Sequence, residues 1–181
     1  MATTIVVGPC RGSFLHVFTP RAVQEGQEAK YSGCVLINKK DTATVSAVKA
    51  AIAAETSIGW PNGKLPKGFK SPLKDGDGLT NSKTGEQRPE TKGCFVINAS
   101  SKTKPGIVDA QRQEVIDPAQ IYSGANYRWQ LAFAPYKLPT SSGIGCYLNN
   151  LQKTSDGPSL EGRMDAKDAF DDYTPPDGTD C

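Results

Sequence analysis

The chain has 181 residues, a formal net charge of +2 and an ordinary charged fraction of 22%. A chain of this length is expected to fold as one domain with its own core, and 18 glycines with 13 prolines indicate many turns. No stretch approaches membrane-spanning length and no signal peptide is visible, so we expect a soluble protein of a reducing compartment and exclude a membrane protein.

Charge is divided unevenly along the chain. Residues 161–181 hold seven acids and two bases, a balance of −5, whereas residues 1–160 hold 19 bases and 12 acids, a balance of +7. A basic body with an acidic end is typical of a polyanion-binding domain with an interaction tail. Charge alone leaves open an ordinary solvated surface with a soluble end. We expect a binding domain over 1–160 and a disordered acidic tail over 161–181.

Metal and cofactor sites are not indicated. The five cysteines form no Cys-x-x-Cys pair, and the single histidine, His16, lies in an apolar strand-like segment where a structural role is expected. Asp75 and Asp77 fit the first positions of a calcium loop, but Leu79 and Thr80 stand where an oxygen ligand and a glycine are needed. We interpret this Asp-Gly repeat as a turn and expect no cofactor and no metal.

The first third of the chain predicts two strands and a helix. Residues 4–18 and 31–37 have strand-like alternation of their side chains. Residues 42–55 follow Asp41, a good N-cap, and carry one apolar stripe at helical spacing. We expect this alanine-rich helix to pack against the sheet.

Residues 60–89 lose this periodicity and predict a long basic loop. Lysines recur there every three or four residues, with two aromatic residues among them. Such a mixture is typical of a surface that binds single-stranded nucleic acid without sequence preference. Solvated lysines over a loop anchored by buried aromatics fit the pattern equally well. The binding candidates of this loop are Trp60, Lys64, Lys67, Phe69 and Lys70.

Three further strands are predicted over residues 93–99, 127–133 and 144–148. In the middle one, Trp129 and its apolar neighbours alternate with polar or small residues. We predict that Trp129, Leu131 and Phe133 face the core, so that the binding candidates lie around this strand rather than in that row. Those candidates are Lys102 and Lys104 on the preceding turn, Tyr122 at the end of a short helix over 117–122, Arg128 and Tyr136.

Five strands, one helix and no βαβ alternation favour a small, mainly antiparallel barrel. The fold class that fits best is the five-stranded Greek-key OB-fold barrel used for oligonucleotides, here with one packed helix, long loops and a disordered acidic C-terminal tail. A β-sandwich is the alternative that the number of strands leaves open.

Residues 97–109 read Ile-Asn-Ala-Ser-Ser-Lys-Thr-Lys-Pro-Gly-Ile-Val-Asp and form the most distinctive stretch. Together with residues 13–20, 30–41, 122–128 and 148–163, in this order, they resemble a family of tailed-bacteriophage single-stranded DNA-binding proteins. The resemblance covers nearly the whole chain, and none of its segments is a catalytic signature. A binding protein rather than an enzyme is therefore expected.

The resemblance implies an OB-fold barrel that binds single-stranded DNA without sequence preference during phage replication or recombination. It places the protein in the cytoplasm of the infected bacterial host. It also implies that the acidic tail contacts phage or host replication proteins. From its charge of −5, we further expect the tail to compete with DNA for the basic surface. The tail candidates are acids with two isolated aromatic residues among them: Asp165, Asp168, Phe170, Asp171, Asp172 and Tyr173.

Two other classes of function stay open from the residues alone. A metal-dependent nuclease would use Asp75, Asp77, Glu86 or Glu90, and its chemistry needs these carboxylates to converge on one cavity. A virion or structural interaction protein would use the acidic tail as its partner motif. The leading hypothesis is that cations neutralise phosphates while aromatic side chains stack on bases.

Overall fold

The computed structural model describes residues 3–22, 25–79, 85, 91–158 and 160. Its strands are β1 (Thr3–Arg21), β2 (Lys30–Asn38), β3 (Leu73–Asp75), β4 (Cys94–Ser101), β5 (Gly106–Val108), β6 (Asn126–Lys137) and β7 (Ser142–Ser155). Its helices are α1 (Thr42–Gly59) and the short 3-10 helices η1 (Gly76–Gly78) and η3 (Pro118–Gln120). The tail candidates Asp165, Asp168, Phe170, Asp171, Asp172 and Tyr173 lie outside the described residues, as do Glu86 and Glu90.

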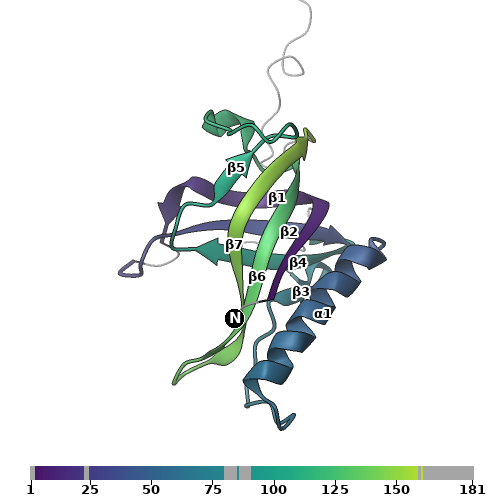
Figure 1. Ribbon diagram of the computed structural model, residues 1–181, viewed down its shortest axis with the longest axis vertical. Helices are drawn as coiled ribbons and strands as arrows, with labels where there is room; N and C mark the ends of the chain where they lie inside the picture. The colour runs from purple at the N-terminus through teal and green to yellow at the C-terminus, as the bar shows by residue number, and fades with distance from the viewer. Residues whose placement is uncertain (1–2, 23–24, 80–84, 86–90, 159, 161–181) are drawn as a thin grey trace, which may run out of the picture.

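Five long strands of the described chain close into a barrel (Figure 1). β1 pairs with β2 and β6, β2 pairs with β4, and β6 pairs with β7, each pair being antiparallel. A parallel bridge between Ser100 of β4 and Tyr147 of β7 closes the ring. The predicted five-stranded barrel is therefore confirmed, and the sandwich alternative is wrong because one closed sheet holds all five strands.

β1 lies between β2 and β6 and pairs with them along successive parts of its length. Its N-terminal part pairs with β6, and its C-terminal part pairs with β2. A register shift lies between Val7 and Cys10, next to Gly8, whose φ is +119°. A Cβ on Gly8 would lie 2.5 Å from the carbonyl oxygen of Tyr127, so only glycine fits at this bulge.

The aromatic row of β6 fills the barrel. Trp129, Leu131 and Phe133 are each 0% exposed, which confirms the prediction that they form the core. Tyr127 is equally buried, and its hydroxyl donates a hydrogen bond to the carbonyl oxygen of Tyr122 at 2.7 Å. Burial raises the pKa of Tyr127 well above its ordinary value, so this hydroxyl stays protonated.

Helix α1 packs against β1 and β6. Its predicted cap is confirmed, because the Asp41 carboxylate accepts a hydrogen bond from the Thr44 amide at 3.2 Å. The helix continues past the predicted end to Gly59, whose carbonyl oxygen accepts a hydrogen bond from Lys137 Nζ at 2.6 Å. That contact satisfies one of the carbonyl groups that every helix leaves open at its C-terminus. No helix of the described ranges is both long and apolar enough to cross a membrane.

The two three-residue strands are not indicated by the sequence pattern. β3 lies inside the predicted long basic loop and pairs with β4 from Leu73 to Asp75. β5 pairs in parallel with β7. Each strand is too short to show a period of two, so tertiary pairing rather than local pattern defines it.

Candidate nucleic-acid interface

The outer face of the barrel is hollowed where β2, β4 and β7 lie side by side. One hollow of about 440 Å³ is lined by Arg21, Gln27, Glu28, Lys30, Ser32 and Ser100. A second of about 320 Å³ is lined by Lys30, Lys70, Ser71, Pro72, Lys74, Asn98, Ser100, Tyr136, Ile144, Gly145, Cys146 and Tyr147. The hollows adjoin because they share Lys30 and Ser100, and together they form what we call the β2–β4–β7 groove.

The floor of the groove follows one row of strand partners. His16 pairs with Ser32, Ser32 pairs with Ser100, and Ser100 pairs with Tyr147, so the row crosses four strands. The two serines in its middle are small and polar. The row therefore provides a low floor with hydroxyl groups, and on β7 it reaches Tyr147, which is 40% exposed.

The lining of the groove is basic. Arg21, Lys30, Lys70 and Lys74 contribute cations, and Glu28 contributes an acid at one end. All four cations are exposed. Since cations along an open groove attract a phosphate backbone whatever its sequence, this lining suits a single nucleic-acid strand.

Two of the predicted residues, Lys70 and Tyr136, line this groove. Lys70 is held by backbone pairing with β7: its amide donates to the carbonyl oxygen of Ser142 at 2.9 Å, and its carbonyl oxygen accepts from the Ile144 amide at 3.0 Å. The chain then enters β3, which pairs with β4 and carries Lys74. Part of the predicted long basic loop is therefore paired with β7 and β4 and holds two of the groove lysines.

The predicted turn with Lys102 and Lys104 lies at the rim of the groove. Lys102 Nζ is 3.7 Å from the carboxylate of Glu28, which lines the groove. Lys104 Nζ lies 5.0 Å from the ring centre of Phe18 on β1. Both lysines are exposed, so the turn adds positive charge next to the end of the groove that holds Glu28.

The other four candidates of the basic loop lie outside the groove lining. Trp60 and Phe69 pack edge to face with ring centres 5.1 Å apart, and both pack against the core. Lys137 Nζ lies 5.1 Å from the Trp60 ring centre. Lys64 and Lys67 are exposed. The two rings thus anchor the loop, which is the alternative that the sequence left open, while the DNA-binding role of all four stays a prediction.

Tyr122 and Arg128 also lie outside the groove lining. The hydroxyl of Tyr122 donates to the Asp156 carboxylate at 3.0 Å, and Arg128 Nη1 donates to Gln152 Oε1 at 3.2 Å. Hydrogen bonds from Lys153 and Tyr122 hold the pKa of Asp156 below its ordinary value. The Arg128 contact joins β6 to β7, and the Tyr122 contact joins the segment before β6 to the residue that follows β7. DNA contacts by Tyr122 and Arg128 stay predictions.

The end of the described chain lies beside the groove. Leu160 packs against Cys34, Leu36 and Val96 on the outer face of β2 and β4. Cys34 is the strand partner of Asn98, which lines the groove. The last described residue therefore lies on the same face of the barrel as the groove.

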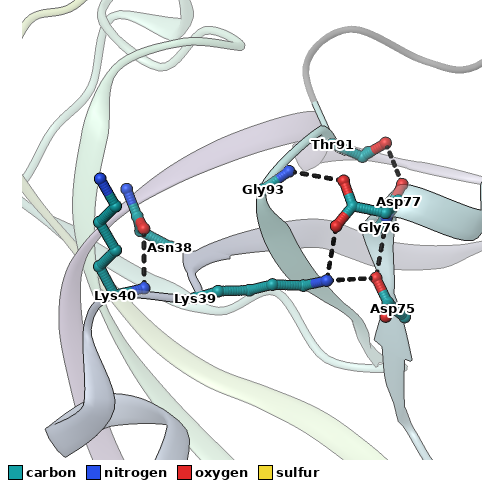
Figure 2. Close-up of polar contacts among 8 residues, drawn as sticks. All are labelled: Asn38, Lys39, Lys40, Asp75, Gly76, Asp77, Thr91 and Gly93. Carbon is teal, nitrogen blue, oxygen red and sulfur yellow. Dashed lines mark hydrogen bonds and ion pairs between the residues drawn. The ribbon is translucent and has the colours of Figure 1, made fainter.

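The carboxylates suggested for metal binding hold a lysine instead (Figure 2). Lys39 Nζ lies 2.7 Å from Asp75 Oδ1 and 2.6 Å from Asp77 Oδ2. The other Asp77 oxygen accepts a hydrogen bond from the Gly93 amide at 2.8 Å. Hydrogen bonds from Lys39 hold the pKa of Asp75 and Asp77 below the ordinary value. The cluster joins η1 to the start of β4 and the turn before α1, and the described residues hold no group of ligands that fits a metal ion.

Comparison with known proteins decides the family. The model of the family described as "Enterobacter phage Enc34, ssDNA-binding protein" matches residues 3–179. The chain belongs to this family. No curated protein sequence matches it.

Solved structures agree with this assignment. The single-stranded DNA-binding protein from bacteriophage Enc34 in complex with ssDNA is 25% identical, with a TM-score of 0.68 over 86% of this chain and 88% of that one. Another structure of the Enc34 protein is 27% identical, with a TM-score of 0.67 over 93% and 90% of the two chains. The single-stranded DNA-binding protein gp2.5 of bacteriophage T7 is 13% identical, with a TM-score of 0.55 over 90% and 97%, and shares the fold.

Several groove residues are missing from the sequence-based candidates. Arg21 at the end of β1 and Lys30 at the start of β2 lie singly and form no local cluster. Lys74 continues the lysine spacing of the predicted basic loop but is not among its binding candidates. Tyr147 does carry a signal, because it alternates with Cys146 and Leu148, which are 5% and 1% exposed. A period of two places Tyr147 on the outer face of its strand.

Proposed function

We propose that this protein binds single-stranded DNA along the β2–β4–β7 groove, without sequence preference, in phage DNA replication or recombination. The observation that carries the proposal is a basic groove with two tyrosines on the face that OB folds use for oligonucleotides. Membership of a family of ssDNA-binding proteins, and the likeness to the Enc34 protein in its ssDNA complex, support it.

Binding of this kind follows from charge and stacking. Lysines such as Lys30 and Lys74 attract any phosphate and release its counterions. For each phosphate contact, affinity for a single strand therefore falls by about 0.7 logarithmic units per tenfold increase in salt concentration. Aromatic rings stack on any base and contribute about 1–3 kcal/mol for each. Because a duplex hides the faces of its bases, stacking favours single strands.

The protein acts by binding and not by catalysis, as its family does. The two described carboxylates of the nuclease alternative, Asp75 and Asp77, are held by Lys39. The virion alternative has no observation in its favour among the described residues. Binding of phage DNA during replication places the protein in the cytoplasm of the infected bacterial host.

We also assign the acidic tail a role at the groove. The net charge of the tail is −5, whereas that of residues 1–160 is +7. The tail follows Leu160, which packs on the outer face of β2 and β4. The tail competes with DNA for the groove lysines and becomes available to replication proteins once DNA has displaced it. Its candidate residues are Asp165, Asp168, Phe170, Asp171, Asp172 and Tyr173.

The test is a fluorescence anisotropy titration with oligo-dT and with a duplex of equal length, each at several salt concentrations. The full chain is compared with a chain truncated after Leu160. We expect a preference for oligo-dT, an affinity that falls with salt, and tighter binding after truncation. Equal affinity for the duplex, or an affinity independent of salt, contradicts DNA binding as proposed. Unchanged affinity after truncation contradicts the role of the tail alone.

A further inference from the structure

The ring of Tyr147 lies over Gly145 on the outer face of β7. A Cβ built on Gly145 would lie 2.8 Å from the hydroxyl oxygen of Tyr147, 3.0 Å from Cζ and 3.2 Å from Cε2. The backbone of Gly145 is not in the left-handed region that favours glycine. The glycine is needed for space, because any side chain there would push the ring away.

The ring is therefore supported from below and open from above. On one side the ring lies close to the backbone of Gly145, and 40% of Tyr147 stays exposed to solvent. The core does not need this ring, since Cys146 and Leu148 on either side supply the buried row. An aromatic side chain held in one position loses little conformational freedom when a flat partner stacks on it.

The surroundings of the ring fit a nucleotide. Tyr147 follows Ser32 and Ser100 in one row of strand partners, so the floor beside the ring is made of small side chains. Lys30 and Lys74 line the same hollow as Tyr147 and can hold the phosphates on either side of a stacked base.

We propose that Tyr147 is a base-stacking platform of the groove and that Gly145 preforms it. The inference rests on the proposed function and adds the position at which a base is held. It treats the ring, and not the hydroxyl group, as the part that binds. Stacking on a ring does not distinguish between bases, which agrees with binding without sequence preference.

The test compares an oligo-dT with an abasic oligonucleotide of the same length and charge. Tyr147→Ala should weaken binding of oligo-dT about 5- to 150-fold, the change that corresponds to 1–3 kcal/mol. It should leave binding of the abasic strand and the salt dependence unchanged. Tyr147→Phe should bind like the native protein, and Gly145→Ala should weaken binding of oligo-dT because it displaces the ring.

Ile116→Ala is the matched control, since Ile116 is 80% exposed and does not line the groove. Thermal unfolding verifies that each variant is folded. Native affinity of Tyr147→Ala for oligo-dT overturns the proposal. So does an equal loss on the abasic strand, or a loss in Tyr147→Phe as large as in Tyr147→Ala. If the native protein binds neither strand, the proposed function itself fails and the platform fails with it.

Discussion

The carbonyl oxygen of Lys70 occupies the space that a side chain on Gly143 would need, since a Cβ there would lie 2.1 Å from that oxygen. The Lys70 backbone is hydrogen-bonded to Ser142 and Ile144, the residues on either side of Gly143. A few residues later the same segment pairs with β4 as β3. Residues 70–75 thus link β7 to β4 along the seam at which the barrel closes.

Gly143→Ala should destabilise the protein by about 1–3 kcal/mol, because the new methyl group forces the Lys70 backbone away from β7. Urea denaturation measures the change in free energy of unfolding. Gly78→Ala is the control, since nothing lies within 4 Å of a Cβ there and its φ lies outside the left-handed region that favours glycine. Its effect should stay within about 0.5 kcal/mol. Equal effects of the two substitutions would mean that the seam tolerates a side chain.

Lys39→Met should make the free energy of unfolding less dependent on pH in the acid range. Lys39 lowers the pKa of Asp75 and Asp77, and a lowered pKa stabilises the fold above the ordinary value, near pH 4. That contribution is lost as pH falls through the lowered pKa. The native chain should therefore exceed the variant in stability at pH 6, and the difference should vanish once the pH has fallen below the lowered pKa values of both carboxylates. If the native chain stays more stable than the variant even at the lowest pH, Lys39 stabilises the fold by packing rather than by its charge.

Glu28→Gln should strengthen DNA binding. Glu28 is the acid at one end of the groove, and its carboxylate lies 3.7 Å from Lys102 Nζ. Its negative charge therefore repels phosphates and pairs with a lysine that could otherwise bind them. In water, charges at this distance interact by about 1 kcal/mol, so the gain is at most about fivefold. It should shrink as salt is added. Glu114→Gln, an exposed change that does not touch the groove, should leave affinity as it was. A loss of affinity in Glu28→Gln would show that Glu28 supports the groove.

The fold was largely predictable because its signals are local. A strict period of two marks Trp129 and its row as core, and Asp41 before an apolar helical stripe marks the start of α1. The short strands β3 and β5 carry no such pattern. They exist because β4 and β7 offer them backbone partners.

The candidate site was predictable only in part because it depends on strand register. Lys30 and Ser100 line the same two hollows although 70 residues separate them, and only the pairing of β2 with β4 brings them together. Lys70 and Tyr136 could be named from the composition of their surroundings. Trp60 resembles a stacking residue in sequence, yet it packs against the core and Phe69.

The groove lysines give the most direct test of where DNA binds. A double variant, Lys30→Gln with Lys74→Gln, is compared with a double variant of the exposed loop, Lys64→Gln with Lys67→Gln. Both remove two positive charges, so the net charge is matched. The measurement is the slope of the logarithm of oligo-dT affinity against the logarithm of salt concentration. The groove variant should lower the steepness of that slope by about 1.4, which is 0.7 for each lost phosphate contact, and the loop variant should keep the native slope. A native slope in the groove variant with a reduced slope in the loop variant would contradict the β2–β4–β7 groove as the DNA-binding site.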